Sequence, residues 1–385
     1  MELKKIHISD IGKIVTGKTP RTSIVENYGG NIPFLTPSDD LSYKSVPKTS
    51  KTLTEQGLNE VKNCLLPPHS VCVSCIGSDL GKVVMTLEPT ITNQQFNSII
   101  PNRQFNADFV YYLMTLVGKE LNYLSKTSTA VPIINKSSFS NYEVEVPDLK
   151  KQEKIASILS SLDDKIELNR RINGNLEQQV QALYAKAFSS TNTCKMGDVV
   201  ETTSGGTPSR KNQNYFSSQG IKWIKSKELN GSFIFDSEEH ISNDGLCNSS
   251  AKLLPPNSTL IAMYGATVGA YGLTIDNATC NQAICALLPN SQYPYTYLYM
   301  WAKNNKDELI QKAIGSAQQN ISQIIIKNMP VANEKDKIIR FDSDTRYIFS
   351  LMKSLAKENY NLIALRDALL PRLMSGELKI NDLNR

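Results

Sequence analysis

The feature that most constrains the fold is an internal duplication. The segment "ISDIGKIVTGKTPR" at Ile8 returns as "MGDVVETTSGGTPS" at Met196, and "LLPPHSVCVSCIGSDLG" returns as "LLPPNSTLIAMYGATVG". "NIPFLTPSDDL" and "ITNQQFNSIIP" return as "GIKWIKSKEL" and "ATCNQAICALLP". Three aligned pairs are each 188 residues apart: Thr19 and Thr207, Pro67 and Pro255, and Asn93 and Asn281. A repeat of this length is too long for a solenoid, so we expect two similar domain-sized units.

Each copy has two parts. The first part holds short β-branched and aromatic runs, such as "SVCVSCIG" and "TLIAMYG", that are broken by Gly, Pro and Asn. This pattern is typical of a mostly β domain with a few helices. In the second part, Gln152 to Phe188 contain no proline, and apolar residues recur at steps of three and four, which predicts a long helix with one buried seam.

The seam of the central helix occupies the core positions of a heptad pattern: Ile155, Leu159, Leu162, Ile166, Asn169, Asn173, Leu176, Val180, Leu183 and Ala187. A shift of 186 residues gives the same seam in the last segment: Phe341, Thr345, Ile348, Met352, Leu355, Asn359, Leu362, Leu369 and Leu373. Two matched helices that each need an apolar partner are expected to pack on each other. The asparagines are compatible with two arrangements, a buried one that fixes register and one at the edge of the seam that faces water.

These patterns predict an α+β fold in which two similar, mostly β domains are separated by two long helices that form a coiled coil, with pseudo-twofold symmetry. The expected boundaries are residues 1–149 for the first β domain, 150–190 for the central helical region, 191–333 for the second β domain and 334–385 for the distal helical region.

The stretch "GKIVTGKTP" at Gly12 fits the phosphate-binding loop pattern G-x-x-x-x-G-K-[ST]. Such a loop needs a helix directly after it, whereas here Pro20 follows and "RTSIVENYGGN" is typical of a loop. In the second copy the essential Lys18 is replaced by Gly206. What both copies retain is a G-x-T-P turn, so we interpret the motif as a turn at the end of a strand.

Other catalytic or metal chemistry is not supported. The Cys72-x-x-Cys75 pair has no counterpart in the second copy, and residues three apart on a strand point to opposite faces. The histidines His7, His69 and His240 are widely spaced and unmatched between the copies, so no metal cluster or general base is expected. We expect the chain to be non-catalytic and to bind no cofactor itself.

The composition excludes a membrane protein. No apolar run approaches the roughly 20 residues that span a bilayer, and the start "MELKKIHISDIGKIV" lacks the apolar core of a signal peptide. Seven cysteines without framework spacing suggest reduced thiols and a cytoplasmic protein. A net charge of +5 permits nucleic-acid binding without demanding it.

Two diverged domains at a fixed separation are suited to reading two half-sites on one DNA duplex, about one helical turn or ~34 Å apart. Divergence between the copies makes the half-sites different, so the combined site is expected to be asymmetric and bipartite. If about six base pairs are read at ~1–3 kcal/mol each, the available discrimination covers that of typical specific binders.

Over essentially its full length the chain resembles the specificity (S) subunit of type I restriction–modification enzymes. The resemblance is carried by the duplicated "GKTP"/"GGTP" turns, the duplicated "LPP…G…NQ" blocks, the central "QEKIASILSSLDDKIELNRRINGNLE" and the terminal "LRDALLPRLMSGEL". It implies two target recognition domains, one per half-site, alternating with two conserved helical regions that pair antiparallel and set the spacer. It also implies double-stranded DNA, two methyltransferase (modification) subunits and restriction/translocase subunits as partners. Adenine methylation with S-adenosylmethionine, and ATP- and Mg-dependent cleavage, would belong to those partners. The two adjacent polar layers, Asn169 and Asn173, depart from a regular apolar seam.

Candidate DNA contacts are polar, basic or aromatic residues on expected loops at aligned places. In the first domain they are Lys18, Thr19, Arg21, Tyr28, Thr36, Ser38 and Lys82. In the second they are Thr207, Ser209, Arg210, Lys211, Tyr215, Lys225, Lys227 and Tyr264. The pairs Asn93-Gln94 and Asn281-Gln282 also suit adenine, but residues kept in both copies are expected to serve the shared fold, because the two half-sites differ.

Three other hypotheses remain open. A self-contained methyltransferase or nuclease would require cofactor and catalytic motifs that we do not find in the sequence. A non-catalytic coiled-coil adaptor would show no sequence-dependent DNA affinity. A specificity subunit of a related bipartite-site system, with a fused nuclease–methylase partner, would have the same sequence features.

Overall fold

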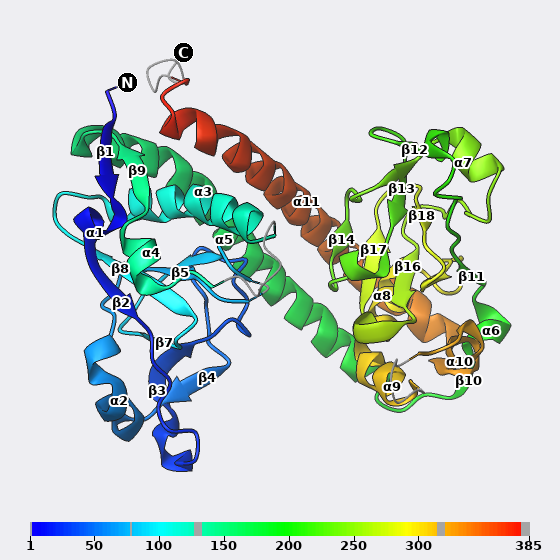
Figure 1. The fold of residues 1–385 in the computed structure, drawn as a ribbon. Helices are drawn as coiled ribbons and strands as arrows, with labels where there is room; N and C mark the ends of the chain where they lie inside the picture. The colour runs from blue at the N-terminus through cyan, green and yellow to red at the C-terminus, as the bar shows by residue number, and fades with distance from the viewer. Residues whose placement is uncertain (1, 78, 127–132, 314–319, 379–385) are drawn as a thin grey trace. The chain divides into compact units, whose positions relative to one another are not determined.

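The computed structural model describes residues 2–77, 79–126, 133–313 and 320–378 of the chain (Figure 1). The chain divides into two compact units, residues 1–166 with 362–385 and residues 167–361. Each unit therefore contains one β domain together with segments of both long helices.

The β domain of the first unit consists of short strands with a single longer helix. Its strands are β1 (Lys4–His7), β2 (Gly12–Thr16), β3 (Tyr28–Leu35), β4 (Lys51–Leu53), β5 (Val71–Ser74), β6 (Val83–Met85), β7 (Ile91–Thr92), β8 (Phe96–Pro101) and β9 (Glu143–Val146). Its helices are α1 (Ile8–Ile11), α2 (Glu55–Val61), α3 (Ala107–Lys126) and α4 (Lys136–Ser140), with the 3-10 turns η1 (Val25–Asn27) and η2 (Lys62–Cys64).

These strands form three sheets. The orders are β2-β8-β5-β6, β4-β3-β7 and β1-β9. All pairings are antiparallel except β3 with β7. Strand β5, "VCVS", is buried along its whole length. On one face its side chains belong to a hydrophobic cluster that includes α3, and on the other face they belong to a second cluster. A continuous apolar run is the pattern expected of a strand that is covered on both faces.

The β domain of the second unit has the same plan with shorter helices. Its strands are β10 (Thr193–Lys195), β11 (Thr202–Ser204), β12 (Phe216–Ser217), β13 (Ile221–Ile224), β14 (Phe233–Ile234), β15 (His240–Ile241), β16 (Thr259–Ala262), β17 (Tyr271–Thr274), β18 (Thr279–Cys280), β19 (Ile284–Leu287) and β20 (Pro330–Ala332). Its helices are α6 (Met196–Val199), α7 (Asn243–Cys247), α8 (Tyr295–Asn304), α9 (Lys306–Gln311) and α10 (Gln323–Asn328), with η3 (Gln213–Tyr215), η4 (Ser226–Glu228) and η5 (Gly265–Thr267).

The sheet orders of the first unit recur in the second, where each of the two larger sheets has one additional strand, β14 or β12. In the second unit they are β11-β19-β16-β17-β14, β12-β15-β13-β18 and β10-β20. Strand β13 pairs parallel with β18 as β3 pairs with β7, and β16 is fully buried as β5 is. The predicted α+β class and the two similar domains are thereby confirmed.

The "LPPHS" and "LPPNS" segments are turns that lead into strands. His69 and Asn257 both adopt left-handed backbone conformations, with φ of 64° and 62°. The next residue in each turn, Ser70 or Ser258, donates its hydroxyl to the carbonyl of Pro67 or Pro255 at 2.7 Å. Strands β5 and β16 begin directly after these serines.

Two helices of 40 residues each, α5 (Leu149–Phe188) and α11 (Lys335–Met374), account for the predicted long helical segments. At 1.5 Å per residue each is about 60 Å long. Helix α5 begins three residues earlier than the apolar pattern indicates, because the Asp148 carboxylate accepts from the backbone N–H of Lys151 at 3.0 Å and caps the first turn. Figure 1 shows each of the two helices as one continuous ribbon.

In the second unit the two helices pack antiparallel. Phe341, near the start of α11, contacts the rings of Tyr184 and Phe188, near the end of α5, at centroid distances of 5.7 and 5.6 Å. Leu183 does not hold its predicted core position, since it is 37% exposed and the neighbouring Tyr184 is buried instead. The aromatic partners Phe341 and Tyr297 favour a ring at this position, and the seam shifts by one residue to supply it.

Asparagines form further contacts along this helix pair. Asn169 and Asn359 are both buried, and Asn169 donates its amide to Asn359 Oδ1 at 3.0 Å and to Glu358 Oε2 at 2.7 Å. Asn173 is half-buried and donates to the Met352 carbonyl at 3.2 Å. The asparagines of the seam therefore contact the opposite helix.

The helix pair of the first unit has an ionic centre. Buried Asp163 of α5 accepts from Arg366 of α11 at 2.7 Å and from the Tyr112 hydroxyl of α3 at 2.5 Å. Beyond it, Leu159 of α5 shares a hydrophobic cluster with Leu370 of α11. Asp163 thus connects three helices.

The phosphate-loop pattern and the cysteine pair have structural explanations. Gly12–Thr16 is strand β2 of a sheet, and in residues 17–27 the only helical element is the three-residue η1. The pattern therefore forms no phosphate cradle. Cys72 and Cys75 belong to different hydrophobic clusters on opposite sides of the sheet, as the spacing predicts, and burial raises the pKa of the Cys72 thiol to about 12.

Candidate nucleic-acid interface

The two G-x-T-P turns, residues 17–20 and 205–208, are held by the same backbone contacts in each unit. Gly17 and Lys18 donate their N–H groups to the carbonyls of Phe96 and Thr92 at 3.1 and 2.9 Å. In the second unit Gly205 and Gly206 donate to Ile284 and Cys280 at 3.3 and 2.9 Å. We call these segments the shared turns.

Close packing explains the glycine at the head of each shared turn. A methyl group at Gly17 would lie 2.1 Å from the Asn93 carbonyl oxygen, and one at Gly205 would lie 2.1 Å from that of Cys280. Both distances are far below van der Waals contact, so only glycine fits at this approach of two backbones.

The threonines of the shared turns bind the glutamines of the Asn-Gln pairs. Thr19 donates its hydroxyl to Gln94 Oε1 at 2.7 Å, and Thr207 donates to Gln282 Oε1 in the same way. Residues kept in both copies therefore contact one another, which is the arrangement expected of residues that serve the shared fold.

In the first unit, two of the candidate residues beside the shared turn have protein partners. Arg21 is exposed and donates Nε and Nη2 to Glu60 Oε1 at 2.9 and 2.6 Å, while its backbone N–H binds Glu60 Oε2. The Arg21 guanidinium lowers the pKa of Glu60 to about 2. Tyr28 is half-buried and donates its hydroxyl to the Pro20 carbonyl at 2.9 Å. Lys18 is exposed at the centre of the turn.

The other first-unit candidates lie elsewhere on the domain. Thr36 is buried in the turn that follows β3, where its hydroxyl contacts that of exposed Ser38 at 2.6 Å and its N–H binds Asp39. Lys82 is exposed in the β5–β6 turn, next to Gly81, which packs closely against Gly118 of α3.

In the second unit, three of the candidate cations gather around two glutamates. We call Arg210, Lys225, Lys227, Glu238 and Glu239 the charge cluster. Lys225 Nζ lies 2.7 Å from Glu239 Oε1 and 2.9 Å from Glu238 Oε2, and Lys227 Nζ lies 2.7 Å from the same Glu238 oxygen. Arg210 Nη1 binds the second Glu239 oxygen.

The ion pairs of the charge cluster lower the pKa values of its two carboxylates. Hydrogen bonds first from Arg210 and then from Lys225 lower the pKa of Glu239 to about 2. The pKa of Glu238 is lowered by Lys227 and Lys225. Both glutamates are therefore ionised at neutral pH and neutralise much of the positive charge around them.

Arg210 also packs against aromatic rings. Its guanidinium carbon lies 4.4 Å from the ring centroid of Phe216 and 5.1 Å from that of Trp223. Trp223 in turn donates its indole N–H to the Gly206 carbonyl at 2.9 Å, which connects this aromatic pair to the shared turn.

The remaining candidates of the second unit are spread over three places. Ser209 and Lys211 are exposed on either side of Arg210, and Tyr215 is half-buried in η3. Tyr264 is exposed after β16 and pairs in a bridge with Asn320. The structure thus brings together the residues around Arg210 and Lys225, and it places Tyr264 on a separate loop.

Sequence reasoning did not identify the acidic partners. Glu60 lies 39 residues after Arg21, and Glu239 lies 29 residues after Arg210, on elements that only the fold brings close. The two glutamates occupy unmatched positions in the two copies, so the duplication gave no signal for them.

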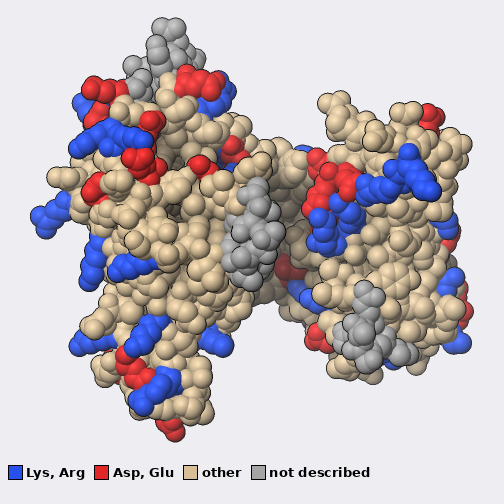
Figure 2. All heavy atoms as spheres, in the orientation of Figure 1, with Lys and Arg blue, Asp and Glu red and all other residues tan. Residues whose placement is uncertain are grey.

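On the face drawn in Figure 2, acidic side chains lie directly beside basic ones in several groups. Within the described residues, no group of three or more His, Cys, Asp or Glu side chains is placed to hold a metal ion. Among the described helices, none combines the length and the apolar character needed to cross a membrane.

Comparison with known proteins points to one family. The family model described as the type I restriction modification DNA specificity domain matches residues 1–178 and 189–339. The chain is 25% identical over 415 aligned residues to the type I restriction enzyme MjaIX specificity subunit of Methanocaldococcus jannaschii, with 99% of this chain and 94% of that protein covered. It is 36% identical over 172 residues to the HindI specificity subunit of Haemophilus influenzae, with 43% of this chain and 37% of that protein covered.

A solved structure has a similar fold. The S subunit of a type I restriction-modification system from M. genitalium superposes with a TM-score of 0.57 at 13% identity, and 97% of this chain and 96% of that chain are covered. At this level of identity the likeness concerns the fold alone.

Proposed function

Because the chain belongs to the family of type I restriction–modification DNA specificity domains, we propose that each of its two units recognises one half of an asymmetric, bipartite DNA site. Membership in this family assigns the chain to sequence recognition and not to catalysis. The individual contacts, the domain boundaries and the partners described below are part of the proposal.

One observation carries the idea of two different half-sites. Each unit presents an arginine within two residues of the end of its shared turn, Arg21 in the first and Arg210 in the second, but their surroundings differ. Arg21 binds Glu60, whereas Arg210 binds Glu239 and packs on Phe216 and Trp223. A common framework with different side chains at the same place is what two related readers of different sequences require.

The proposed DNA contacts divide into two kinds. The exposed lysines Lys18, Lys82 and Lys211 are suited to phosphates, whose contacts supply affinity but little sequence information. The residues around Arg21 and Arg210 are suited to base edges, which carry the sequence. Thr19 and Thr207 support the turns through their glutamine partners, and Tyr28 and Thr36 also have protein partners.

The proposed partners are two methyltransferase subunits and the restriction subunits of the same system. We propose that residues 1–149 and 191–333 act as target recognition domains. The helical regions 150–190 and 334–385 would then set the spacer and dock the modification subunits. S-adenosylmethionine, ATP and Mg would be bound by the partners, and the complex would act in the cytoplasm, where the chromosome lies.

The test is a base-resolution methylation map of the native genome with and without this gene. We expect adenine methylation at one asymmetric, gapped motif that disappears on deletion. Replacing residues 28–82 by the matching segment of another family member should then change one half-site and leave the other intact. A change in both halves would contradict the assignment of one half-site to each unit.

The adaptor hypothesis makes the opposite prediction. If the chain only joins proteins through its helices, the purified chain with its neighbouring methylase will show no sequence preference on random DNA. A motif that is cleaved and methylated by a single fused partner would instead indicate the related bipartite-site system.

A further inference from the structure

We propose that Arg210 recognises a guanine in the half-site of the second unit, and that Glu239, Phe216 and Trp223 hold its guanidinium in position for this contact. The inference rests on the proposed function, since it names a specificity-determining residue of that DNA site. It also distinguishes Arg210 from Arg21, which occupies the neighbouring position in the first unit.

The aromatic platform under Arg210 is fixed to the framework of the domain. Phe216 and Trp223 meet edge to face, with ring centroids 6.0 Å apart and an interplanar angle of 78°. The hydrogen bond from the Trp223 indole to Gly206 holds the platform beside the shared turn. A guanidinium that packs on such rings loses little conformational freedom when it binds a ligand.

Glu239 binds the guanidinium of Arg210 through Nη1 only. It accepts from Arg210 Nη1, and its other oxygen accepts from Lys225 at 2.7 Å. Among the described residues, Nε and Nη2 of Arg210 have no protein acceptor, and the side chain is 55% exposed. The free edge offers two parallel N–H donors, which match the O6 and N7 acceptors that guanine presents in the major groove.

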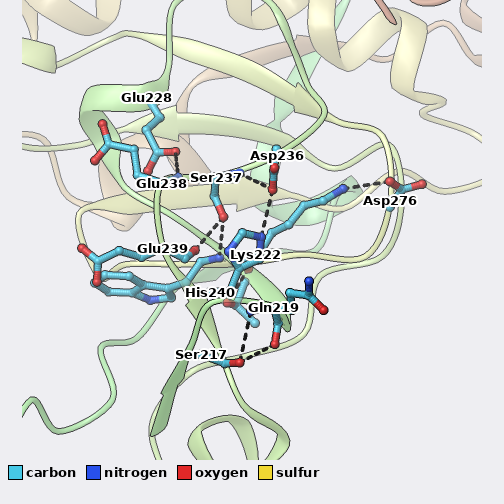
Figure 3. Close-up of polar contacts among 12 residues, drawn as sticks. Ser217, Gln219, Lys222, Glu228, Asp236, Ser237, Glu238, Glu239, His240 and Asp276 are labelled. Atoms are coloured by element: carbon cyan, nitrogen blue, oxygen red, sulfur yellow. Dashed lines mark hydrogen bonds and ion pairs between the residues drawn. The ribbon is translucent and has the colours of Figure 1, made fainter. Parts of the chain in front are cut away.

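Glu239 is itself held by its neighbours. The backbone carbonyl of Glu239 accepts from the Ser237 hydroxyl at 2.6 Å and from the backbone N–H of Trp223 at 3.0 Å. The next residue, His240, lies in strand β15 opposite Lys222 of β13. Its Nε2 lies 2.9 Å from Asp236 Oδ1 (Figure 3). The Glu239 carboxylate therefore starts from a fixed backbone, which is what a positioning residue requires.

The first unit lacks this arrangement. Arg21 donates both Nε and Nη2 to the same oxygen of Glu60, so the edge that would match guanine is already occupied by the protein. Arg21 is thus a matched control for Arg210, since it lies on the equivalent turn and carries the same charge.

The experiment uses the full chain in complex with its modification subunits and a pool of DNA duplexes with randomised sequence. Wild-type complex is expected to select a guanine at one position of the second half-site. Arg210→Lys keeps the charge but loses the paired donors, so discrimination at that guanine should fall about 10- to 100-fold while all other positions are unchanged. Glu239→Gln should weaken discrimination at the same position by a smaller factor, because it removes the charge that aligns Arg210.

Two control variants separate base recognition from general DNA affinity. Lys211→Gln should lower affinity for all sequences alike and reduce the slope of log affinity against log salt by about 1. Arg21→Lys should leave the second half-site unchanged. Thermal unfolding of each variant checks that the fold is retained, and if Arg210→Lys does not fold, Glu239→Gln carries the test at the same base.

The inference is overturned if Arg210→Lys lowers the affinity for all DNA sequences equally. It is also overturned if the selected second half-site contains no guanine whose preference depends on Arg210. A wild-type complex without any sequence preference would instead overturn the proposed function itself, and with it the inference.

Discussion

The two units share a framework and differ in how their exposed side chains are held. Both shared turns are fixed by backbone hydrogen bonds and by a threonine–glutamine contact. The arginines that follow them differ, since Arg21 binds one glutamate and Arg210 lies within a five-residue charge cluster over two aromatic rings. The comparison teaches that duplication preserved the backbone geometry and left the side chains beyond it free to diverge.

The junctions between the long helices differ as well. In the first unit Asp163 joins Arg366 and Tyr112, whereas in the second unit Asn169 pairs with Asn359. One junction thus depends on a buried charge and the other on amide groups. We expect the ionic junction to be the more sensitive of the two, because a buried charge that loses its partner is costly.

The largest effect is expected from Asp163→Ala. It leaves the Tyr112 hydroxyl without this acceptor and leaves the Arg366 guanidinium with Asp367 as its remaining carboxylate partner, and should destabilise the first unit by about 3–4 kcal/mol. Faster amide hydrogen exchange in α3 measures this loss. The tryptophan fluorescence transition reports only the second unit, because Trp223 and Trp301 both lie there.

The matched change in the second unit is Asn169→Ala, which should cost only about 1–2 kcal/mol, since it removes hydrogen bonds to the Asn359 amide and the Glu358 carboxylate but no charge. An equal loss for both variants would show that the two junctions are energetically alike.

Intermediate effects are expected for Gly17→Ala and Gly205→Ala. Each added methyl group would lie 2.1 Å from a backbone carbonyl oxygen, so each unit should lose about 2–4 kcal/mol. Segment-resolved hydrogen exchange should show the loss in the first unit for Gly17→Ala and in the second for Gly205→Ala.

Gly174 in α5 provides the control for these two changes. A methyl group there meets no atom within 4 Å, and Gly174→Ala should stabilise the helix by about 0.5–1 kcal/mol. If only one of the two turn glycines proved sensitive, the shared framework would not be energetically equivalent in the two copies.

The smallest effect concerns how the second β domain contacts α11. Lys353 of α11 donates to Asn257 Oδ1 at 2.5 Å and lies 3.9 Å from the centroid of the Tyr295 ring. Burial lowers the pKa of Lys353 to about 8. Between pH 8 and the usual value of 10.5 the unfolded chain binds more protons than the folded one, so this group makes stability rise with pH.

Lys353→Met should remove that rise. Urea unfolding followed by tryptophan fluorescence at pH 7.5 and 9.5 should show that the wild type gains about 2 kcal/mol relative to the variant at the higher pH. A constant difference between the two proteins would mean that Lys353 keeps its usual pKa.

Much of the fold was predictable because it depends on local patterns and on the repeat. The duplication predicted two similar domains, and proline-free periodicity predicted both long helices. The seam was predicted less well at Leu183, because its pattern does not reveal that Phe341 and Tyr297 favour an aromatic ring at position 184. Helix α5 begins at Leu149, three residues before the apolar pattern, since Asp148 caps the helix through a side chain that lies outside that pattern.

The candidate interface was less predictable. The sequence identified the exposed cations near the turns, but it could not pair them with glutamates that lie 29 or 39 residues away. It also gave no reason to distinguish Arg21 from Arg210. That distinction depends on which nitrogen atoms each glutamate occupies, and only the assembled fold determines this.

The backbone anchoring of the shared turns has a consequence for how such a protein can change. The hydrogen bonds from Gly17 and Lys18 to Phe96 and Thr92 involve no side chain of the loop that follows them. A loop that starts from such a backbone anchor can change its sequence while its entry geometry stays intact. Each unit can therefore acquire new sequence preferences through changes in this loop, without changes in the domain that carries it.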